Sequence, residues 1–459
     1  MDIIAAIATG HSPTAIGIVR VSGQGCFACC DRVFRAFNGS PFSQQTPRNM
    51  VFGEMLDAQG RVIDQGLAVR FPGPRSYTGE DSAEFHCHGS PVVLRELLGA
   101  LFAAGARQAK AGEFTRRAFL NGRLDLTQAE AVIDLIDAET ASAARNAAAQ
   151  LAGGLRRVLE PIQDALLDVT SRFYAVVDYP DEDIEDIRPE QGAQALDSSA
   201  AALDRLLATC QRGKVLKSGV RTAIVGRPNA GKSSLLNALA GFDRAIVTDI
   251  PGTTRDTVEE SVLCGGVLLR LTDTAGIRDT EDTVEQLGVE RSRKALEAAD
   301  LVLAVVDGSV PPTAEDLAVL RLAAKSPRWS AVFSKCDLWD TKTRSVGVIG
   351  QVGTPAASVS LSAVTGQGLA RLEAAVAALF PAGEAPASGS LLTDQRQEEA
   401  ARRARDAVRR AKEALDAGLT PDAILTDAED ALSALGALTG KSVKEDLVAT
   451  IFSRFCVGK

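Results

Sequence analysis

The feature that most constrains this sequence is a glycine-rich loop, Gly226–Ser234 (GRPNAGKSS), between a short apolar run at 222–225 and a segment with helical spacing at 235–239. A strand, a loop of the pattern G-x-x-x-x-G-K-[ST] and a helix, in this order, bind phosphate. The two glycines let successive backbone N–H groups face one point, to which the helix start adds positive charge. Lys232 is expected to reach the outer phosphates, and the Ser233 hydroxyl to hold Mg²⁺.

Four later segments stand in the order that a GTPase site requires. Thr248–Asp256 is placed as a switch loop with Thr254 as second Mg²⁺ ligand, and a strand at 267–271 runs into Asp273-Thr-Ala-Gly276, where Asp273 would hold Mg²⁺ through water. Another strand ends on Asp337, which can accept both the N1–H and the exocyclic amine of guanine and so select GTP over ATP. Ser360–Ala363 would place a backbone N–H near the guanine carbonyl. The residues expected to contact the nucleotide or its cations are Asn229, Ala230, Gly231, Lys232, Ser233, Ser234, Thr248, Thr253, Thr254, Asp273, Thr274, Ala275, Gly276, Lys335, Asp337, Ser362 and Ala363.

Two departures from the ordinary GTPase pattern carry information. The base-reading motif is Ser334-Lys-Cys-Asp337, where Asn-Lys-x-Asp is usual. Because serine is shorter than asparagine, we expect weaker nucleotide binding, and we expect Ser334→Asn to tighten it by restoring a side-chain bridge to the phosphate loop. The second departure is the apolar Ile277, at the place where Ras-like switches have a glutamine that orients water. Another group must therefore position the attacking water.

The composition is that of a globular protein. The 459 residues, 46% hydrophobic and 24% charged, suffice for about three domains. No apolar run approaches a membrane span, and the start does not resemble a signal peptide, so we expect a cytoplasmic location without a membrane. Eight cysteines without framework spacing predict reduced thiols. The net charge of −9 argues against a nucleic-acid coat, although 402–412 is a candidate basic face, for which a solvated surface is the favoured interpretation.

The hydrophobic periodicity predicts a mixed N-terminal part followed by helices. In the first part the sequence predicts strands at 15–21, 51–57, 66–71 and 83–88, with the second and third as a hairpin, and a helix that begins at Ser90-Pro91. His86-Cys-His88 could suggest zinc, but packed or surface side chains are the better interpretation. The predicted helical segments are 126–179 with a break at Gly153-Gly154, about 189–213, 395–417 and 421–438.

The simplest organisation is a multidomain α/β plus all-α protein. We expect an N-terminal α+β domain at 1–120, a discontinuous helical domain at 121–215 and 383–459, and a Ras-like P-loop GTPase domain inserted at 216–382. Insertion is feasible because the two ends of a domain often lie close together at its surface.

Over its whole length the chain resembles the MnmE (TrmE) family of tRNA-modification GTPases. The segments that carry the resemblance are Ile18–Gly23, Phe71–Pro74, Tyr77–Asp81, Gly112–Thr115, Ala118–Leu126, Gln128–Ala131, Gly226–Asp256 and the ending Ile451–Lys459. The resemblance implies a GTP hydrolase that works with a flavin-dependent partner of the MnmG (GidA) kind. Together they would modify C5 of the wobble uridine of certain tRNAs with an aminomethyl or carboxymethylaminomethyl group, using a one-carbon unit from formyl-tetrahydrofolate.

The resemblance also implies further site residues. It implies a homodimer through the N-terminal domains, with folate contacts at Arg20, Glu80, Arg123 (where the family often has lysine) and Lys459. It implies a K⁺ ion in place of an arginine finger when two GTPase domains pair. The implied K⁺ ligands are the Asn229 side chain and oxygens of Thr248, Ile250 and Thr253. Glu285 matches the carboxylate that orients water, and Cys456 matches a cysteine near the folate site, for which a role in the modification and simple packing both stay open.

Two other functions share parts of the pattern. A ribosome-assembly GTPase, which switches and binds RNA without modifying it, has the GTPase motifs but no use for Arg20, Glu80 and the Cys-x-Gly-Lys ending. A stand-alone folate enzyme regulated by GTP would need a redox cofactor, and no flavin or nicotinamide fingerprint is present.

Overall fold

The computed structural model describes residues 2–10, 12–178, 189–242, 260–271, 296–339, 349–350, 352–381, 389–441, 451–453 and 455–458. The chain divides into two compact units, each assembled from separate stretches of sequence. Unit 1 comprises Met1–Ile133, Gln150–Leu196 and Asp406–Lys459, and unit 2 comprises Asp134–Ala149 and Asp197–Arg405. None of the helices in the described ranges is both long and apolar enough to cross a membrane.

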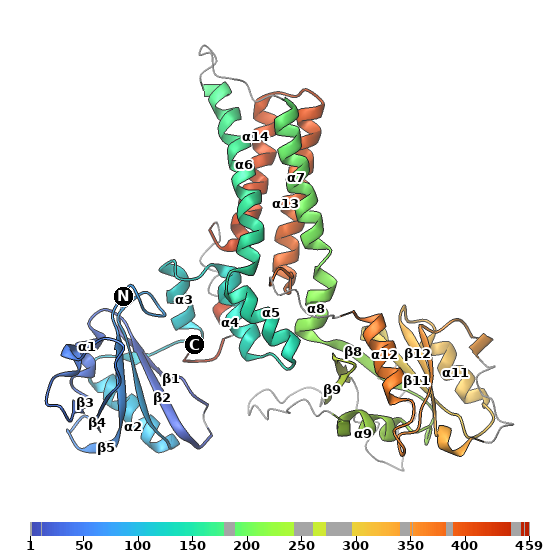
Figure 1. Ribbon diagram of the computed structural model, residues 1–459, viewed down its shortest axis with the longest axis horizontal. Helices are drawn as coiled ribbons and strands as arrows, with labels where there is room; N and C mark the ends of the chain where they lie inside the picture. Colours follow the sequence, from blue (N-terminus) through green and yellow to red (C-terminus); the bar gives the residue numbers. More distant parts are fainter. Residues whose placement is uncertain are drawn as a thin grey trace. The chain divides into compact units, whose positions relative to one another are not determined.

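Unit 1 contains a seven-stranded, mainly antiparallel sheet in the order β3-β4-β5-β6-β2-β1-β7 (Figure 1). Its core, in which Phe34, Phe42 and Phe85 are in ring contact, packs against α1 (Cys26–Cys30) and α2 (Pro91–Ala103). All four strands predicted here and the hairpin are confirmed. So is the start of α2, where the Ser90 hydroxyl accepts a hydrogen bond from the Val92 N–H. The strands are β1 Ile4–Ile7, β2 Thr14–Ser22, β3 Phe34–Ala36, β4 Val51–Leu56, β5 Val62–Phe71, β6 Ser82–Gly89 and β7 Arg107–Gln108.

Long helices form the rest of unit 1. Within it, α6 lies along α14, where the Tyr174 hydroxyl donates to Glu429, and the second half of α13 joins α14 through Arg410 and Asp427, 2.7 Å apart. The predicted helices at 395–417 and 421–438 and the break at Gly153 are confirmed. The helices that lie wholly or mainly in unit 1 are α3 Glu113–Leu120, α4 Leu126–Ile136, α6 Gly154–Asp178 and α14 Pro421–Thr439. The two units share α13 Gln395–Asp416, and α5 Ala141–Leu151 belongs mainly to unit 2.

The C-terminal tail packs against unit 1 near the beginning of α3. Phe452 and Phe455 lie against Phe119 and Ala129, and Val457 forms an isolated bridge with Ala111. Gly112 makes this close approach possible, because a Cβ atom there would stand 2.6 Å from the carbonyl oxygen of Phe452.

Unit 2 is built on a six-stranded sheet in the order β13-β12-β11-β8-β10-β9 (Figure 1). All neighbouring strands are parallel except β9, which pairs antiparallel with β10. Apolar clusters cover both faces, as the continuous apolar run of β11 predicts for a parallel sheet. The elements are β8 Val220–Val225, α9 Lys232–Phe242, β9 Glu260–Cys264, β10 Val267–Leu271, β11 Leu301–Asp307, α11 Ala314–Ala323, β12 Trp329–Ser334, β13 Ala357–Ser360 and α12 Leu369–Leu379.

One helix prediction is wrong. The segment predicted as a single helix over 189–213 forms α7 (Pro189–Leu207) and α8 (Cys210–Ser218). The Thr209 hydroxyl explains the interruption: it donates to Leu206 O at 2.6 Å and accepts from Leu392 N at 3.1 Å. A threonine side chain that binds the local backbone in this way competes with the helical hydrogen bonds.

The packing of the tail against Gly112 predicts an unequal pair of glycine variants. Gly112 (φ 63°) and Gly122 (φ 68°) are both left-handed, but only a Cβ at Gly112 meets the tail; nothing lies within 4 Å of a Cβ at Gly122. Gly122→Ala should cost about 1–2 kcal/mol of unfolding free energy for backbone strain alone. Gly112→Ala should cost clearly more in urea unfolding, and equal losses would show that the tail adds nothing.

Candidate functional site

Four parallel strands of unit 2 end at one edge of its sheet. Val225 at the end of β8 leads into the phosphate loop, Asp307 ends β11, Ser334 ends β12 and Ser360 ends β13. The strand order places β8 between β11 and β10. The chain therefore adds β10 on one side of β8 and later adds β11 on the other side. Ligands of open α/β sheets bind at such a switch point, outside the carboxyl ends of the strands. The structure thus brings the predicted phosphate and guanine residues together.

The phosphate loop has the backbone that phosphate binding needs. Asn229 (φ 60°) and Gly231 (φ 95°) are left-handed, which turns successive N–H groups toward one point. The ammonium of Lys232 lies within the loop, donating to Gly226 O at 2.8 Å and Arg227 O at 2.9 Å, and burial lowers the pKa of Lys232. Ser233 and Ser234, at the start of α9, are exposed.

The base-reading segment is joined to the phosphate loop by two hydrogen bonds. The Ser334 hydroxyl lies 2.5 Å from Ala230 O, and Lys335 Nζ donates to Asn229 O at 3.0 Å. The expectation that serine leaves this bridge unmade is therefore wrong. A Cβ placed on Gly231 would lie 3.2 Å from Ser334, so the two segments approach closely enough for the short serine side chain to reach.

Three charged residues of this network, Arg227, Asp307 and Asp316, were missed by sequence reasoning. Arg227 Nε donates to Asp316 Oδ1 at 3.1 Å, and Asp316, which is 1% exposed, also caps α11 through Thr313. Asp307 lies 2.6 Å from Lys335 Nζ; burial opposes its ionisation, but the bond to Lys335 holds the pKa of Asp307 below its usual range. The signal for Asp307 was its place directly after a buried strand, and the signal for Asp316 was its place three residues after Thr313, the spacing of a capping box.

The end of the site predicted to bind guanine carries one exposed acceptor, Asp337, and one backbone donor, the N–H of Ala363. Asp337 is exposed on a short 3₁₀ turn that follows the left-handed Lys335 (φ 56°), and Trp339 Nε1 donates to Ser334 O at 3.4 Å. The N–H of Ser362 donates to Gln367 O at 2.9 Å. Among the described residues the Ala363 N–H has no backbone partner, so it is the better placed of the two for a guanine carbonyl.

The remaining predicted nucleotide and cation residues lie outside the described residues. They are Thr248, Ile250, Thr253, Thr254, Asp273, Thr274, Ala275, Gly276 and Glu285, together with Ile277.

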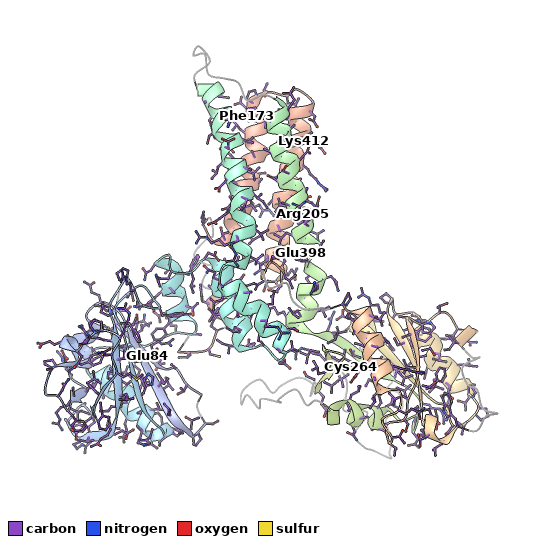
Figure 2. The ribbon with its side chains drawn as sticks, viewed as in Figure 1. Glu84, Phe173, Arg205, Cys264, Glu398 and Lys412 are labelled. Carbon is purple, nitrogen blue, oxygen red and sulfur yellow. The ribbon has the colours of Figure 1, made fainter. Side chains whose placement is uncertain are left out.

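In unit 1 three of the four residues implied as folate contacts, Arg20, Glu80 and Arg123, lie near α3. Arg20 on β2 donates to Glu84 of β6 at 2.9 Å, and its guanidinium lies over the rings of Tyr77 and Phe114; Figure 2 labels Glu84. A Cβ on Gly79, next to Glu80, would lie 3.3 Å from Arg123 Cγ, so Glu80 and Arg123 are close in space.

A buried arginine holds Glu80. Arg117, 4% exposed, donates to Glu80 Oε2 at 2.9 Å and to Asp2 O at 2.8 Å, and it also contacts Glu113. Burial opposes ionisation of Glu113, but hydrogen bonds from Arg107 and Arg117 lower its pKa to about 2. Arg117 thus fixes the Glu80 carboxylate in place as a hydrogen-bond acceptor. Sequence reasoning missed Arg117.

Cys456 lies at the beginning of α3. It is exposed, and its carbonyl oxygen accepts from Gly112 N at 3.3 Å. Its neighbour Gly458 (φ 101°) passes close to β1, where a Cβ would meet Ile7 O at 2.2 Å. The last residue, Lys459, lies outside the described residues.

Comparison with known proteins covers the whole chain. A family model described as "MnmE helical domain" matches residues 126–456, and one described as "GTP-binding protein TrmE N-terminus" matches residues 3–123. Proteins named "tRNA modification GTPase MnmE" are similar: one from Roseiflexus sp. (strain RS-1) is 45% identical over 464 residues, covering 100% of this chain and 99% of that protein. Another, from Symbiobacterium thermophilum, is 43% identical over 458 residues, again covering 100% of this chain and 99% of the other.

The bridge from Ser334 to the phosphate loop predicts that Ser334→Ala weakens GDP binding. One hydrogen bond contributes about 0.5–1.5 kcal/mol, so the dissociation constant measured by calorimetry should rise roughly two- to tenfold. Ser334→Asn should bring no gain, because the bridge exists and Gly231 leaves little room. Ser330→Ala is the matched control: Ser330 is a buried serine of the same strand whose hydroxyl has no partner among the described residues, and its loss should leave affinity unchanged.

Proposed function

This chain belongs to the MnmE family of tRNA modification GTPases, and we propose that it hydrolyses GTP as part of tRNA modification. The observation that carries the proposal is the joining of the phosphate loop and the base-reading segment by Ser334 and Lys335 at one edge of a parallel sheet. The 43–45% identity over the full length to proteins named as tRNA modification GTPases supports the same activity.

Each part of this site has a separate task. The N–H groups of the phosphate loop and Lys232 would hold the β- and γ-phosphates, since positive groups fixed before binding stabilise charge that develops during hydrolysis. Asp337 would accept the two guanine donors, and the Ala363 N–H would meet the guanine carbonyl. An adenine ring offers no such pair of donors, so it would leave the carboxylate unpaired.

We also propose two cations at the phosphates. The exposed Ser233 hydroxyl at the start of α9 fits a Mg²⁺ ligand, and the exposed Asn229 side chain fits a K⁺ ligand. Thr254 would complete the Mg²⁺ site, and Thr248, Ile250 and Thr253 the K⁺ site. When bound, the two cations would neutralise negative charge on the phosphates, the role that an arginine finger fills elsewhere.

The modification itself is proposed from the family resemblance and the arrangement in unit 1. We assign a formyl-tetrahydrofolate site to Arg20, Glu80, Arg123 and Lys459. The Glu80 carboxylate, held by Arg117, suits the N–H donors of a pterin, while arginine and lysine suit the glutamate carboxylates of the folate. The folate would supply one carbon for C5 of the wobble uridine, and a flavoprotein partner of the MnmG kind would supply the redox step. Cys456 lies at the beginning of α3, near these residues, and we propose that it takes part in the modification of the uridine.

The remaining parts of the proposal concern assembly. We propose a cytoplasmic homodimer through the N-terminal domains (1–120), with the GTPase domain (216–382) inserted between the helical segments 121–215 and 383–459. In chain order the sheet of unit 2 lies between α8 and α13, which supports the insertion. Pairing of two GTPase domains would allow each K⁺ site to bind its ion and support hydrolysis.

Nucleoside analysis of tRNA from a deletion strain tests this function. Loss of a C5-substituted wobble uridine, restored by the wild-type chain and not by a Lys232→Ala variant, is the expected result. Unchanged nucleosides would rule out a role in this modification, while leaving GTP hydrolysis to be measured on its own.

The proposed K⁺ site predicts fast GTP hydrolysis in K⁺ and slow hydrolysis in Na⁺, with a rate that rises with protein concentration as GTPase domains pair. Asn229→Ala should remove most of this K⁺ dependence. Steady-state rates measured at saturating GTP in the two salts check the prediction, and equal rates would contradict it.

The proposed water-orienting role of Glu285 predicts that Glu285→Ala loses turnover and keeps GTP affinity. A group that acts in the transition state changes kcat with little effect on binding, and such a role is worth about 10²–10⁴-fold. Single-turnover hydrolysis and nucleotide binding should be measured together. A variant that keeps more than about a tenth of the wild-type turnover would make Glu285 an ordinary carboxylate.

A further inference from the structure

Unit 1 contains a cavity that shares only Arg123 with the residues of the proposed GTPase and folate sites. It has a volume of about 420 Å³ and lies among the end of α3, the start of α4, α6 and the end of α14. The charged residues in its lining are Arg116, Arg123, Arg156, Lys441 and Asp125. Four cations thus face one carboxylate, in a chain whose formal net charge is −9. This local reversal of sign favours an anionic ligand.

Most of these cations are not neutralised by the protein itself. Among the described residues, Arg116, Arg123 and Lys441 form no ion pair, while Arg156 pairs with Glu160 at 2.6 Å. Asp125 is engaged in capping α4, where its Oδ1 accepts from Gln128 N at 2.9 Å and from Thr127 Oγ1 at 2.6 Å. The carboxylate therefore serves the helix start and offsets little of the positive charge.

The basic run of α13 makes an instructive contrast. Arg402 pairs with Glu398, Arg410 with Asp427, and Lys412 with Asp416; Figure 2 labels Glu398 and Lys412. These cations already have carboxylate partners within the chain, so α13 is a weaker candidate for an anionic partner than the cavity in unit 1.

The cavity also has an apolar wall against which a nucleobase could pack. Phe119 and the half-exposed Leu120 supply an apolar side. Arg116 Nε and Asp125 Oδ2 are buried and have no hydrogen-bond partner among the described residues. Both atoms are enclosed by protein, so a base in the cavity would be held by apolar contacts and by the outer cations rather than by these two atoms.

We propose that this cavity binds one nucleotide of the tRNA substrate, with phosphate against its cations and the base against Phe119 and Leu120. The volume falls within the range of small-ligand pockets, and enzymes that modify a base turn it out of its stack into such a pocket. Stacking on an aromatic side chain and contact of phosphate with cations are the two main sources of affinity for single-stranded RNA. The inference rests on the proposed function, which makes RNA the substrate.

A folate carboxylate presents the same anionic chemistry, and Arg123 stands in both proposed sites. Arg116 and Lys441 separate the two sources, because only the nucleotide proposal uses them. The test therefore measures binding of a labelled anticodon stem-loop RNA and of 5-formyl-tetrahydrofolate, each to the full-length chain.

The expected result is a selective loss of RNA binding. Arg116→Gln and Lys441→Gln should each lower the slope of log affinity against log salt by roughly 0.7–0.9, which corresponds to about fivefold weaker binding near 0.1 M salt. Arg116→Lys should restore the slope. Arg410→Gln, which removes a cation that is already paired, is the matched control and should change RNA affinity less than about twofold. GTP hydrolysis without RNA should be the same in all variants, and urea unfolding that matches the wild-type chain confirms that unit 1 of each variant folds.

The other outcomes are decisive as well. If Arg116→Gln and Lys441→Gln bind RNA like the wild-type chain, the cavity is not a nucleotide site, and the proposed function stands. If they lose folate and keep RNA, the anion is a folate carboxylate and the proposal is overturned. If the wild-type chain binds no RNA at all, the nucleotide site and the proposed function fail together.

Discussion

Parallel pairing of β8 with β11 and β10 is the constraint on which the nucleotide site depends. Because parallel strands end at a common edge, residues more than a hundred positions apart in sequence are brought within hydrogen-bond distance: Ser334 reaches Ala230, and Lys335 reaches Asn229. The loops can then adopt left-handed backbone at Asn229 and Lys335, since these side contacts hold them in place. The sheet thus determines how the two loops meet, and the loops supply the groups that would contact the nucleotide.

A single buried guanidinium has a comparable place in unit 1. Arg117 contacts Asp2 near the first strand, Glu80 in the loop before β6, and Glu113 on its own helix. Removing one partner from a buried cluster of this kind leaves uncompensated charge, which is costly. The cluster therefore fixes three separate chain segments relative to one another, and the position of Glu80 follows from that arrangement rather than from its own loop.

Much of this could be predicted from the sequence, and the failures have identifiable causes. Periodicity and turn residues found the hairpin β4–β5, the start of α2 at Ser90 and the strands β8, β10, β11 and β12 of unit 2, because these signals are local, whereas β9 was not predicted. The helix break at Thr209 was missed because it depends on Leu392, far along the chain. The bridge from Ser334 to the phosphate loop was missed for a similar reason. The Ser334 hydroxyl reaches Ala230 O only because Gly231 lies close to Ser334, and the sequence motif does not show this distance. The switch residues and Glu285 lie outside the described residues, so they remain predictions.

The position of Trp339 has a spectroscopic consequence. The chain has two tryptophans; Trp329 begins β12, and Trp339 follows the base-reading turn and donates to Ser334 O. Both belong to unit 2, so indole emission originates entirely from the sheet that carries the nucleotide site. Tryptophan emission, excited at the red edge of the absorption band, would report guanine binding without any attached dye. Unit 1, whose described tyrosines are Tyr77 and Tyr174, would be silent in the same experiment.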